Sequence, residues 1–406
     1  MLPISNTISH TNNHTAEVMT NGQVGHILVV DDNESNRDML SRRLRRSGYD
    51  VDVAVDGRQA LEMIYNGNFD LVLLDIMMPE INGYEVLERL KSDEAFRHVP
   101  VLMISAVDDM DSVVRCIELG ADDYLPKPFN PTLLKARVQA SLSRKRLHDR
   151  EQLYARSLEQ ELEIGRRIQR SFLPLVVPQP DGWDIAVRFQ PAQQVAGDFY
   201  DVFDVPGGRV GLLIADVCGK GVGAALFMAL FRSLIRAYTD RASVSPASPA
   251  MGILIEAITA TNGYVRTVHK SAHMFASVFF GILEPCTGRL HYVNAGHLPP
   301  VIYDPNGETR RLAPSGPAVG LMSTASFEVR QARLEPGELL LGFTDGVTEA
   351  RNAARDFYTE ERLLALLTEL RPSASAVLDR IEDAVGAFSC ETCPSDDLTL
   401  LAVRRI

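Results

Sequence analysis

The alternation of apolar and polar positions divides the chain into regions of different pattern. Between residues 26 and 142, five short apolar runs alternate with five stretches of helical spacing. The runs that predict strands are 26–30, 51–55, 71–75, 101–105 and 123–126, and the stretches that predict helices are 34–47, 57–67, 83–92, 110–119 and 130–142. This alternation predicts an α/β domain with a five-stranded, doubly wound parallel sheet.

Residues 143–173 are highly charged and carry no turn signal before Pro174, which predicts one long helix that continues the helix of 130–142. Apolar residues recur along it at spacings that fit a coiled-coil seam, although two glutamates and Gly165 interrupt the repeat. The seam residues are Leu147, Tyr154, Leu158, Ile168 and Phe172. The pattern predicts a helical linker with coiled-coil character, through which a homodimer could form.

From Trp183 onward the predicted strands cluster, with helices between the clusters. The strand-like runs are 184–190, 198–203, 209–216, 275–283, 290–296, 327–334, 338–345 and 398–405, and the helical stretches are 221–237, 250–268, 360–369 and 375–388. Clustering without strict alternation predicts an α+β fold, in which two mainly antiparallel sheets stack between helix layers. The predicted organisation is a loose tail (1–25), a first domain (26–142), the linker (143–173) and a second domain (174–406).

Composition and charge narrow the functional classes. The chain has 406 residues, 46% hydrophobic and 23% charged, which is typical of soluble globular domains. A net charge of -12 argues against a nucleic-acid partner, because binding phosphates requires positive charge. No uninterrupted apolar run of about 18 residues occurs, so we expect no membrane span. Five scattered cysteines indicate a reducing, cytoplasmic location, and Cys390 with Cys393 lacks the second pair that structural zinc requires.

Polar side chains stand at the ends of the predicted strands of the first domain. Asp31 and Asp32 follow the first strand, Asp75 ends the third, Ser105 ends the fourth and Lys127 follows the fifth. In a parallel sheet these ends share one edge. Carboxylates gathered there repel each other unless a cation lies among them, and Mg²⁺ suits a site of few carboxylates and several waters. The pattern therefore predicts a magnesium site beside a phosphoryl group on Asp75.

Four segments of this domain resemble the receiver domain of two-component response regulators. They are VVDDN at 29–33, LLDIMMPEINGYE at 73–85, ISA at 104–106 and the run Lys127-Pro128-Phe129. The resemblance implies that Asp75 accepts a phosphoryl group from a histidine kinase. The alternative is a nucleotide-binding domain with incidental acidic strand ends, but no glycine-rich phosphate loop follows the first strand.

The receiver resemblance also implies roles for the neighbours of Asp75. Asp31, Asp32 and Asp75 would hold Mg²⁺ together with the backbone carbonyl of Met77. The residues implied to read the phosphoryl group are the switch pair Ser105 and Tyr124 and the ion-pair partner Lys127.

Aspartates also stand at strand ends in the second domain. They are Asp198 in GDFYDVF, Asp216 in IADVCGKG, Asp345 in FTDGVTEA, and Asp396 and Asp397 in PSDDLTLL. A ligand set of carboxylates without His or Cys favours hard ions such as Mn²⁺ or Mg²⁺. Several aspartates around one point predict two ions about 3.5–4 Å apart, which can activate a water and clamp a phosphate ester.

Together with LEIGRRIQRSFLP (162–174), QVAGDFYD (194–201) and NAGHLPP (294–300), these motifs resemble the PPM protein phosphatases, in particular their SpoIIE/RsbU-like branch. The resemblance covers about 160–406. It implies that Asp216 bridges two metal ions and that the carbonyl of Val217 binds one of them. The remaining implied ligands are Asp345 and Asp396 at the second ion and Asp198 on an ion or its water. A metal-activated water would be the nucleophile.

These resemblances imply a response regulator whose output is a phosphoserine/phosphothreonine protein phosphatase, controlled by Asp75 through the helix of 130–173. The implied substrate is a phosphorylated STAS-domain anti-sigma factor antagonist. A catalytically idle PPM fold that sequesters its partner is the alternative. A DNA-binding output is excluded, because no helix-turn-helix pattern follows residue 142. His297 in NAGH is either a catalytic acid or a structural histidine, and His269 with His273 fits a helix end better than a metal pair.

Overall fold

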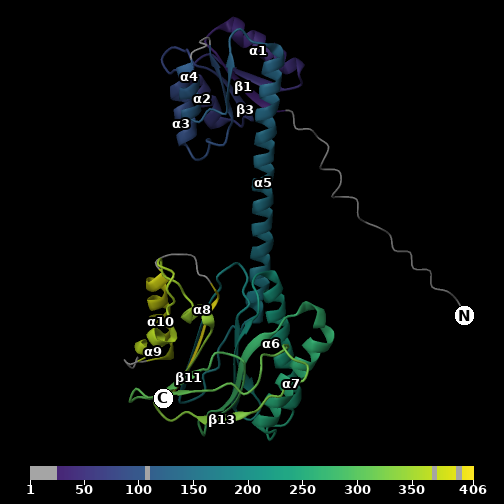
Figure 1. Ribbon diagram of the computed structural model, residues 1–406, viewed down its shortest axis with the longest axis vertical. Helices are drawn as coiled ribbons and strands as arrows, with labels where there is room; N and C mark the ends of the chain where they lie inside the picture. The colour runs from purple at the N-terminus through teal and green to yellow at the C-terminus, as the bar shows by residue number, and fades with distance from the viewer. Residues whose placement is uncertain (1–24, 106–109, 368–372, 390–395) are drawn as a thin grey trace, which may run out of the picture. The chain divides into compact units, whose positions relative to one another are not determined.

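A computed structural model describes residues 25–105, 110–367, 373–389 and 396–406 (Figure 1). The predicted tail (1–25) lies outside the described residues except for residue 25. The pair Cys390 and Cys393 also lies outside them. The chain forms two compact units, of which the first ends at Ser157 and the second covers Leu158–Ile406. Each unit has its own core and is described by itself.

The first unit is the predicted doubly wound α/β domain. Its parallel sheet has the strand order β2-β1-β3-β4-β5. Separate apolar clusters cover the two faces of the sheet, and every residue of β3 and β4 is buried, which explains their unbroken apolar sequences. The elements are β1 (His26–Val30), α1 (Glu34–Arg46), β2 (Asp50–Ala54), α2 (Gly57–Asn66), β3 (Leu71–Asp75), α3 (Gly83–Ser92), β4 (Val101–Ser105), α4 (Met110–Glu118) and β5 (Asp123–Pro126).

Helix α5 (Pro131–Phe172) has 42 residues, so the prediction that the charged stretch continues the helix of 130–142 is confirmed. Neither residue 142 nor Gly165 interrupts it, and the boundary between the two compact units falls inside it. Four of the five predicted seam residues are more than half exposed, namely Leu147, Tyr154, Leu158 and Ile168.

The second unit consists of two stacked antiparallel sheets. Their strand orders are β13-β10-β9-β8-β7 and β12-β11-β14-β15-β6. An apolar cluster with residues of both sheets, including Ile214 and Leu401, fills the space between them. The strands are β6 (Trp183–Gln190), β7 (Phe199–Val205), β8 (Arg209–Val217), β9 (Ala276–Glu284), β10 (Arg289–Ala295), β11 (Val301–Tyr303), β12 (Thr309–Arg311), β13 (Arg330–Arg333), β14 (Leu339–Phe343) and β15 (Leu398–Arg405).

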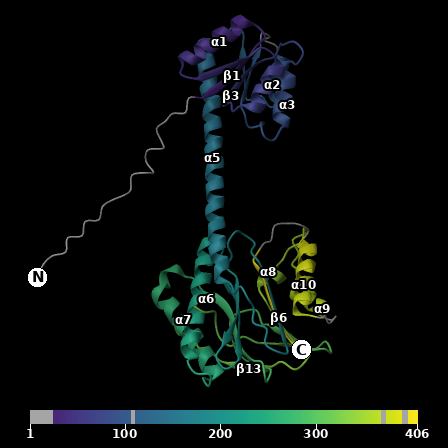
Figure 2. The same ribbon diagram turned by 180° about the vertical axis from the view of Figure 1, so that it is seen from behind.

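Helices cover both outer faces of this sandwich (Figures 1 and 2). The helices α6 (Val222–Ala242) and α7 (Ala250–Val268) pack on the first sheet, and α9 (Glu360–Leu366) and α10 (Ala374–Ser389) pack on the second. Among the described helices, α6 alone is long and apolar enough by composition to cross a membrane. Met228, Phe231 and Ile235 on one of its faces are fully buried in the core, which accounts for part of this apolar character.

The structure differs from the predicted elements in several places. The sequence analysis missed β11 and β12, which have three residues each, and the short helix α8 (Asp345–Thr348). The strand predicted over 327–334 is limited to Arg330–Arg333. Asp345 therefore does not end a strand but begins α8, one residue after Thr344.

Candidate functional site

The acidic residues of the first unit converge at the carboxyl edge of its sheet. Oxygen atoms of Asp31, Asp32 and Asp75 lie within 4.8 Å of one another. Asp31 and Asp75 are buried, whereas Asp32 is exposed. The Nζ atom of Lys127 lies 2.9 Å from Oδ2 of Asp31 and 3.0 Å from Oδ2 of Asp75. The predicted constellation is thus assembled, with a built-in cation between its two buried carboxylates.

Electrostatics at this edge favour a further cation. Burial raises the pKa of Asp75. The hydrogen bond from Lys127 lowers this pKa, and the charge of Asp31 raises it further. Burial alone would lower the pKa of Lys127, but hydrogen bonds to Asp31 and Asp75 outweigh this and raise it. Three carboxylates thus face one ammonium group, and the oxygen-only donor set fits a hard ion such as Mg²⁺.

The remaining predicted receiver residues lie around this cluster. Ser105 ends β4 and is buried, and Tyr124 lies on β5 with a partly buried side chain. Met77 follows Asp75 by two residues and exposes its side chain. Asn36 was not predicted: its Nδ2 atom donates to both carboxylate oxygens of Asp31, each at 3.1 Å.

The aspartates of the second unit form another cluster, at one end of the two sheets. The pKa of Asp216, near the end of β8, is raised to about 6, first by burial and then by the charges of Asp345 and Asp396. Burial and the charge of Asp216 also raise the pKa of Asp198. Segments up to about 200 residues apart therefore bring these four carboxyl groups into one electrostatic neighbourhood.

This cluster is more open than that of the receiver. Among the described residues, only the receiver trio has three potential ligand atoms mutually within 4.8 Å. The Nζ atom of Lys220, whose side chain is about half exposed, lies 2.8 Å from Oδ2 of Asp396. A wider ring of oxygen donors fits two hard ions side by side rather than one, and bound ions would relieve the repulsion that raises the pKa of Asp216.

Two threonine hydroxyl groups donate hydrogen bonds to one aspartate of the cluster, and the sequence analysis did not predict them. Oδ2 of Asp198 accepts hydrogen bonds from Oγ1 of Thr344 at 2.6 Å and from Oγ1 of Thr399 at 2.7 Å. All three side chains are buried. The only signal in the sequence is that Thr344 directly precedes Asp345.

Asp397 has a positioning role. Its carboxylate accepts hydrogen bonds from the backbone N–H groups of Ala192 and Gly197, both at 2.8 Å, so it fastens the loop that leads into Asp198. The carboxylate of Asp397 is thus engaged in the loop, and Asp396 as a metal ligand stays a prediction. A Cβ atom on Gly346 would lie only 2.0 Å from the carbonyl oxygen of Asp397, which explains the glycine after Asp345.

Val217 ends β8 and is fully buried, and its carbonyl oxygen lies close to the backbone of the loop that leads into Asp198. A Cβ atom on Gly197 would lie 2.9 Å from this oxygen. The glycine of the GDFYD motif thus permits close contact between the segments that carry Asp198 and Asp216.

His297 and His269 both lie at positions that fit a structural role. His297 is buried, its Nδ1 atom lies 2.9 Å from Oγ of Ser277, and burial lowers its pKa to about 4. Ser277 pairs with Asp216 across β9 and β8, so His297 is a neutral support behind the cluster. His269 forms the C-cap of α7, which confirms the helix-end interpretation.

The C-terminal part of α5 contacts the loop before Asp198. The side-chain amide of Gln169 donates to the carbonyl of Ala196 at 2.6 Å and accepts from the N–H of Ala196 at 3.0 Å. Gln169 is buried, and Ala196 lies two residues before Asp198. The helix is therefore attached directly to the acidic cluster of the second unit.

A doubly wound sheet with this acidic edge, and an antiparallel sandwich with a second ring of aspartates, define a receiver domain and a PPM-type phosphatase domain. Residues 27–139 match the family model described as response regulator receiver domain, and residues 206–406 match the model of stage II sporulation protein E (SpoIIE). The chain therefore contains a response regulator receiver domain followed by a SpoIIE-family PPM phosphatase domain. The fold class and both resemblances predicted from the sequence are confirmed.

Known relatives agree with this division. Protein IcfG of Synechocystis sp. is 38% identical over 262 residues, which are 60% of this chain and 41% of IcfG. The regulatory protein PhoP of Bacillus subtilis is 46% identical over 118 residues, 29% of this chain and 48% of PhoP. The chain thus spans less than half of these relatives. The SiaA-PP2C domain of Pseudomonas aeruginosa has the same fold, with a TM-score of 0.53 at 20% identity over 62% of this chain and 98% of that domain.

Proposed function

We infer that the second unit is a metal-dependent phosphatase that hydrolyses phosphoserine or phosphothreonine on a partner protein. The observation that carries this inference is the meeting of Asp198, Asp216, Asp345 and Asp396, each from a different segment, in one like-charged cluster. Such a cluster is costly unless cations occupy it. Since none of the predicted carboxylates is missing, catalysis is favoured over an idle, partner-sequestering fold.

The chain's own residues have distinct roles in this proposal. Asp216 would be shared by two Mn²⁺ or Mg²⁺ ions, Asp345 and Asp396 would hold the second, and the carbonyl of Val217 and the carboxylate of Asp198 would complete the set. Thr344 and Thr399 keep Asp198 oriented through their hydrogen bonds. When bound, the ions would supply the Lewis acidity that generates a nucleophile from water and offsets the charge of the phosphate ester.

The experiment measures phosphate release from a phosphoserine protein with the full chain, with Mn²⁺ or Mg²⁺ and with EDTA. Asp216→Asn should abolish turnover, whereas Asp204→Asn, an exposed aspartate on β7 outside the cluster, should not change it. Equal rates for Asp216→Asn and the wild type would refute the ligand assignment. Binding of the phosphoprotein without turnover in the wild type would support the sequestering alternative.

For the first unit we propose that a histidine kinase phosphorylates Asp75, with Mg²⁺ held by Asp31, Asp32, Asp75 and the carbonyl of Met77. Lys127 would pair with the phosphoryl group, and Ser105 with Tyr124 would report it. The support is the convergence of the three carboxylates and Lys127.

The proposed route from Asp75 to the phosphatase is α5. The helix is continuous, its exposed apolar seam is suited to a second copy of the chain, and Gln169 near its end binds the loop before Asp198. Beryllofluoride, which mimics the phosphoryl group, should change both the phosphatase rate and the mass in solution. Unchanged rate and mass would refute this route.

The proposed substrate is a phosphorylated anti-sigma factor antagonist of the STAS type. The SpoIIE family match is its support. Purified phospho-STAS proteins should be dephosphorylated faster than an unrelated phosphoserine protein of similar size, and equal rates would refute this substrate class.

A further inference from the structure

A cavity of about 360 Å³ opens in the second unit, at the far end of β8 from Asp216. The turn between β7 and β8, the turn between β9 and β10 and the start of α7 line it. Arg209 begins β8, seven residues before Asp216, which corresponds to about 23 Å along a strand. The volume lies within the range of small-molecule sites. The cavity is thus separate from the acidic cluster.

Arg209 lines this cavity and is 7% exposed. Its Nε atom donates to the carbonyl of Pro206 at 2.8 Å, and Nη1 donates to the carbonyl of Ser248 at 2.7 Å. Its Nη2 atom has no acceptor among the described residues, and none of their carboxylate oxygens lies within 4.0 Å of the guanidinium. A buried guanidinium without a counter-charge is energetically costly. The described residues supply no anion for the guanidinium of Arg209.

The start of α7 adds positive potential to the same cavity. Pro249 is the N-cap, makes no side-chain hydrogen bond, and no acidic residue stands in the first turn. The N–H groups of Ala250 and Met251 likewise have no acceptor in the part of the chain that the structure describes. The N-terminus of a 19-residue helix favours a negative charge, and phosphate groups bind at such positions.

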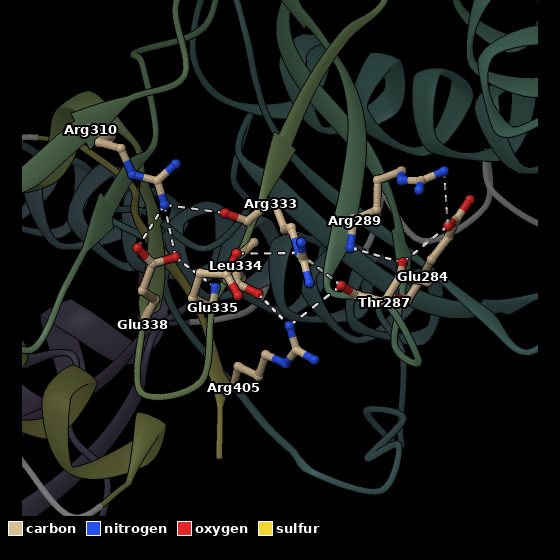
Figure 3. A network of polar contacts seen from close by, with 9 residues as sticks. All are labelled: Glu284, Thr287, Arg289, Arg310, Arg333, Leu334, Glu335, Glu338 and Arg405. Carbon is tan, nitrogen blue, oxygen red and sulfur yellow. Dashed lines mark hydrogen bonds and ion pairs between the residues drawn. The ribbon is translucent and has the colours of Figure 1, made fainter.

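The acidic residue that lines the cavity, Glu284, is occupied elsewhere (Figure 3). Its Oε2 atom lies 3.2 Å from Oγ1 of Thr287 and 4.0 Å from Nη1 of Arg289. Arg333 and Arg405 donate to the carbonyl oxygen of Thr287 from the other side (Figure 3). The carboxylate of Glu284 is thus engaged within its own turn, and no described carboxylate pairs with Arg209.

The geometry points to an anion site in this cavity, at which a phosphate-class oxyanion, free or carried by a small molecule, supplies the counter-charge of Arg209. The planar guanidinium suits tetrahedral oxyanions, and the open start of α7 provides further donors. The volume leaves space for an organic part beside the phosphate group. No part of this site coincides with the proposed phosphatase centre or with the receiver.

The test is the melting temperature of the full chain against the concentration of inorganic phosphate, at constant ionic strength and in EDTA, which removes metal-dependent phosphate binding. A nucleoside monophosphate is the second probe, and the probe that acts at lower concentration identifies the free or the carried form. The wild type should gain about 2–4 °C at roughly five times the Kd. Asp216→Asn should gain as much, because its change lies at the other end of β8.

Two variants should lose the response. Arg209→Met removes the cation. Ser248→Asp places a carboxylate at the cavity and should raise the melting temperature without any added anion, while the neutral Ser248→Asn keeps the phosphate response. Ser248 lies on a partly exposed loop, so this pair remains informative if Arg209→Met fails to fold. A wild type that responds to neither probe, or a response shared by Arg209→Met and Ser248→Asp, would overturn the proposal.

Discussion

The two acidic clusters of this protein are built from the same residue type but neutralised differently. In the receiver, three carboxylates lie within 4.8 Å of one another and Lys127 bridges the two buried ones. In the described part of the phosphatase domain, no three acidic ligand atoms lie that close together, two hydroxyl groups donate to Asp198, and Nζ of Lys220 lies 2.8 Å from Asp396. The receiver thus carries its own cation between two buried carboxylates, whereas the proposed phosphatase centre would depend more strongly on bound metal.

The largest expected effect is a loss of phosphate labelling that occurs in a variant of the receiver cluster but not in a variant of the phosphatase cluster. Asp75→Asn should abolish incorporation of labelled phosphate from acetyl phosphate, because the acceptor carboxylate is missing. Asp216→Asn should leave that labelling intact. Labelling that persists in Asp75→Asn, measured after denaturing electrophoresis, would contradict the receiver assignment.

Removal of metal should affect the phosphatase cluster most. EDTA or Asp216→Asn should lower turnover on the order of a thousandfold or more, since several kcal/mol of transition-state stabilisation are lost.

Calorimetry sharpens the same comparison. In EDTA, Asp216→Asn should melt above the wild type, because one of several repelling charges is gone, and Mn²⁺ should reverse this order. A lower melting temperature of the variant in EDTA would show that repulsion among these carboxylates does not limit the stability of the metal-free protein.

An intermediate effect is expected at the attachment of α5. Gln169→Ala removes both hydrogen bonds to Ala196 and loosens the loop that carries Asp198. Turnover should fall about 10–100-fold, as for other groups that orient metal ligands, while labelling of Asp75 is unchanged. The exposed neighbour Arg167→Ala is the matched control. Equal rates for the two variants would exclude a role of Gln169 in orienting the loop.

The smallest expected effect concerns His297, the buried histidine next to the phosphatase cluster. The folded-state pKa of His297 is lowered to about 4, below its unfolded value of about 6.5, so its contribution to stability is complete above pH 6.5 and is lost as the pH falls towards 4. His297→Asn should therefore lose less stability than the wild type between pH 6.5 and 4, by on the order of 2–3 kcal/mol. Urea unfolding at several pH values measures the difference, and parallel curves would contradict a buried neutral histidine.

Much of this architecture could be predicted because local patterns encode it. Four of the five receiver strands have the predicted bounds, since parallel strands buried on both faces form unbroken apolar runs. Strands β11 and β12 could not be found, because three residues show no periodicity and β12 is wholly exposed.

The site was predicted less completely, for a different reason. The aspartates could be recognised by their motifs, but Thr344 and Thr399 act on Asp198 across 146 and 201 residues of sequence. The link from Gln169 to Ala196 is likewise a contact between distant segments. Such pairs depend on how the strands and loops assemble in three dimensions, and no local spacing in one sequence indicates them.

The attachment of the Asp198 loop to Asp397 has a consequence for the order in which the protein is made. The loop is fastened by a residue about 200 positions later in the sequence. A nascent polypeptide on the ribosome therefore has no complete phosphatase centre until Asp396 and β15 have emerged. Fragments released earlier by premature termination would lack both Asp396 and β15, and with them the residue that fastens the Asp198 loop.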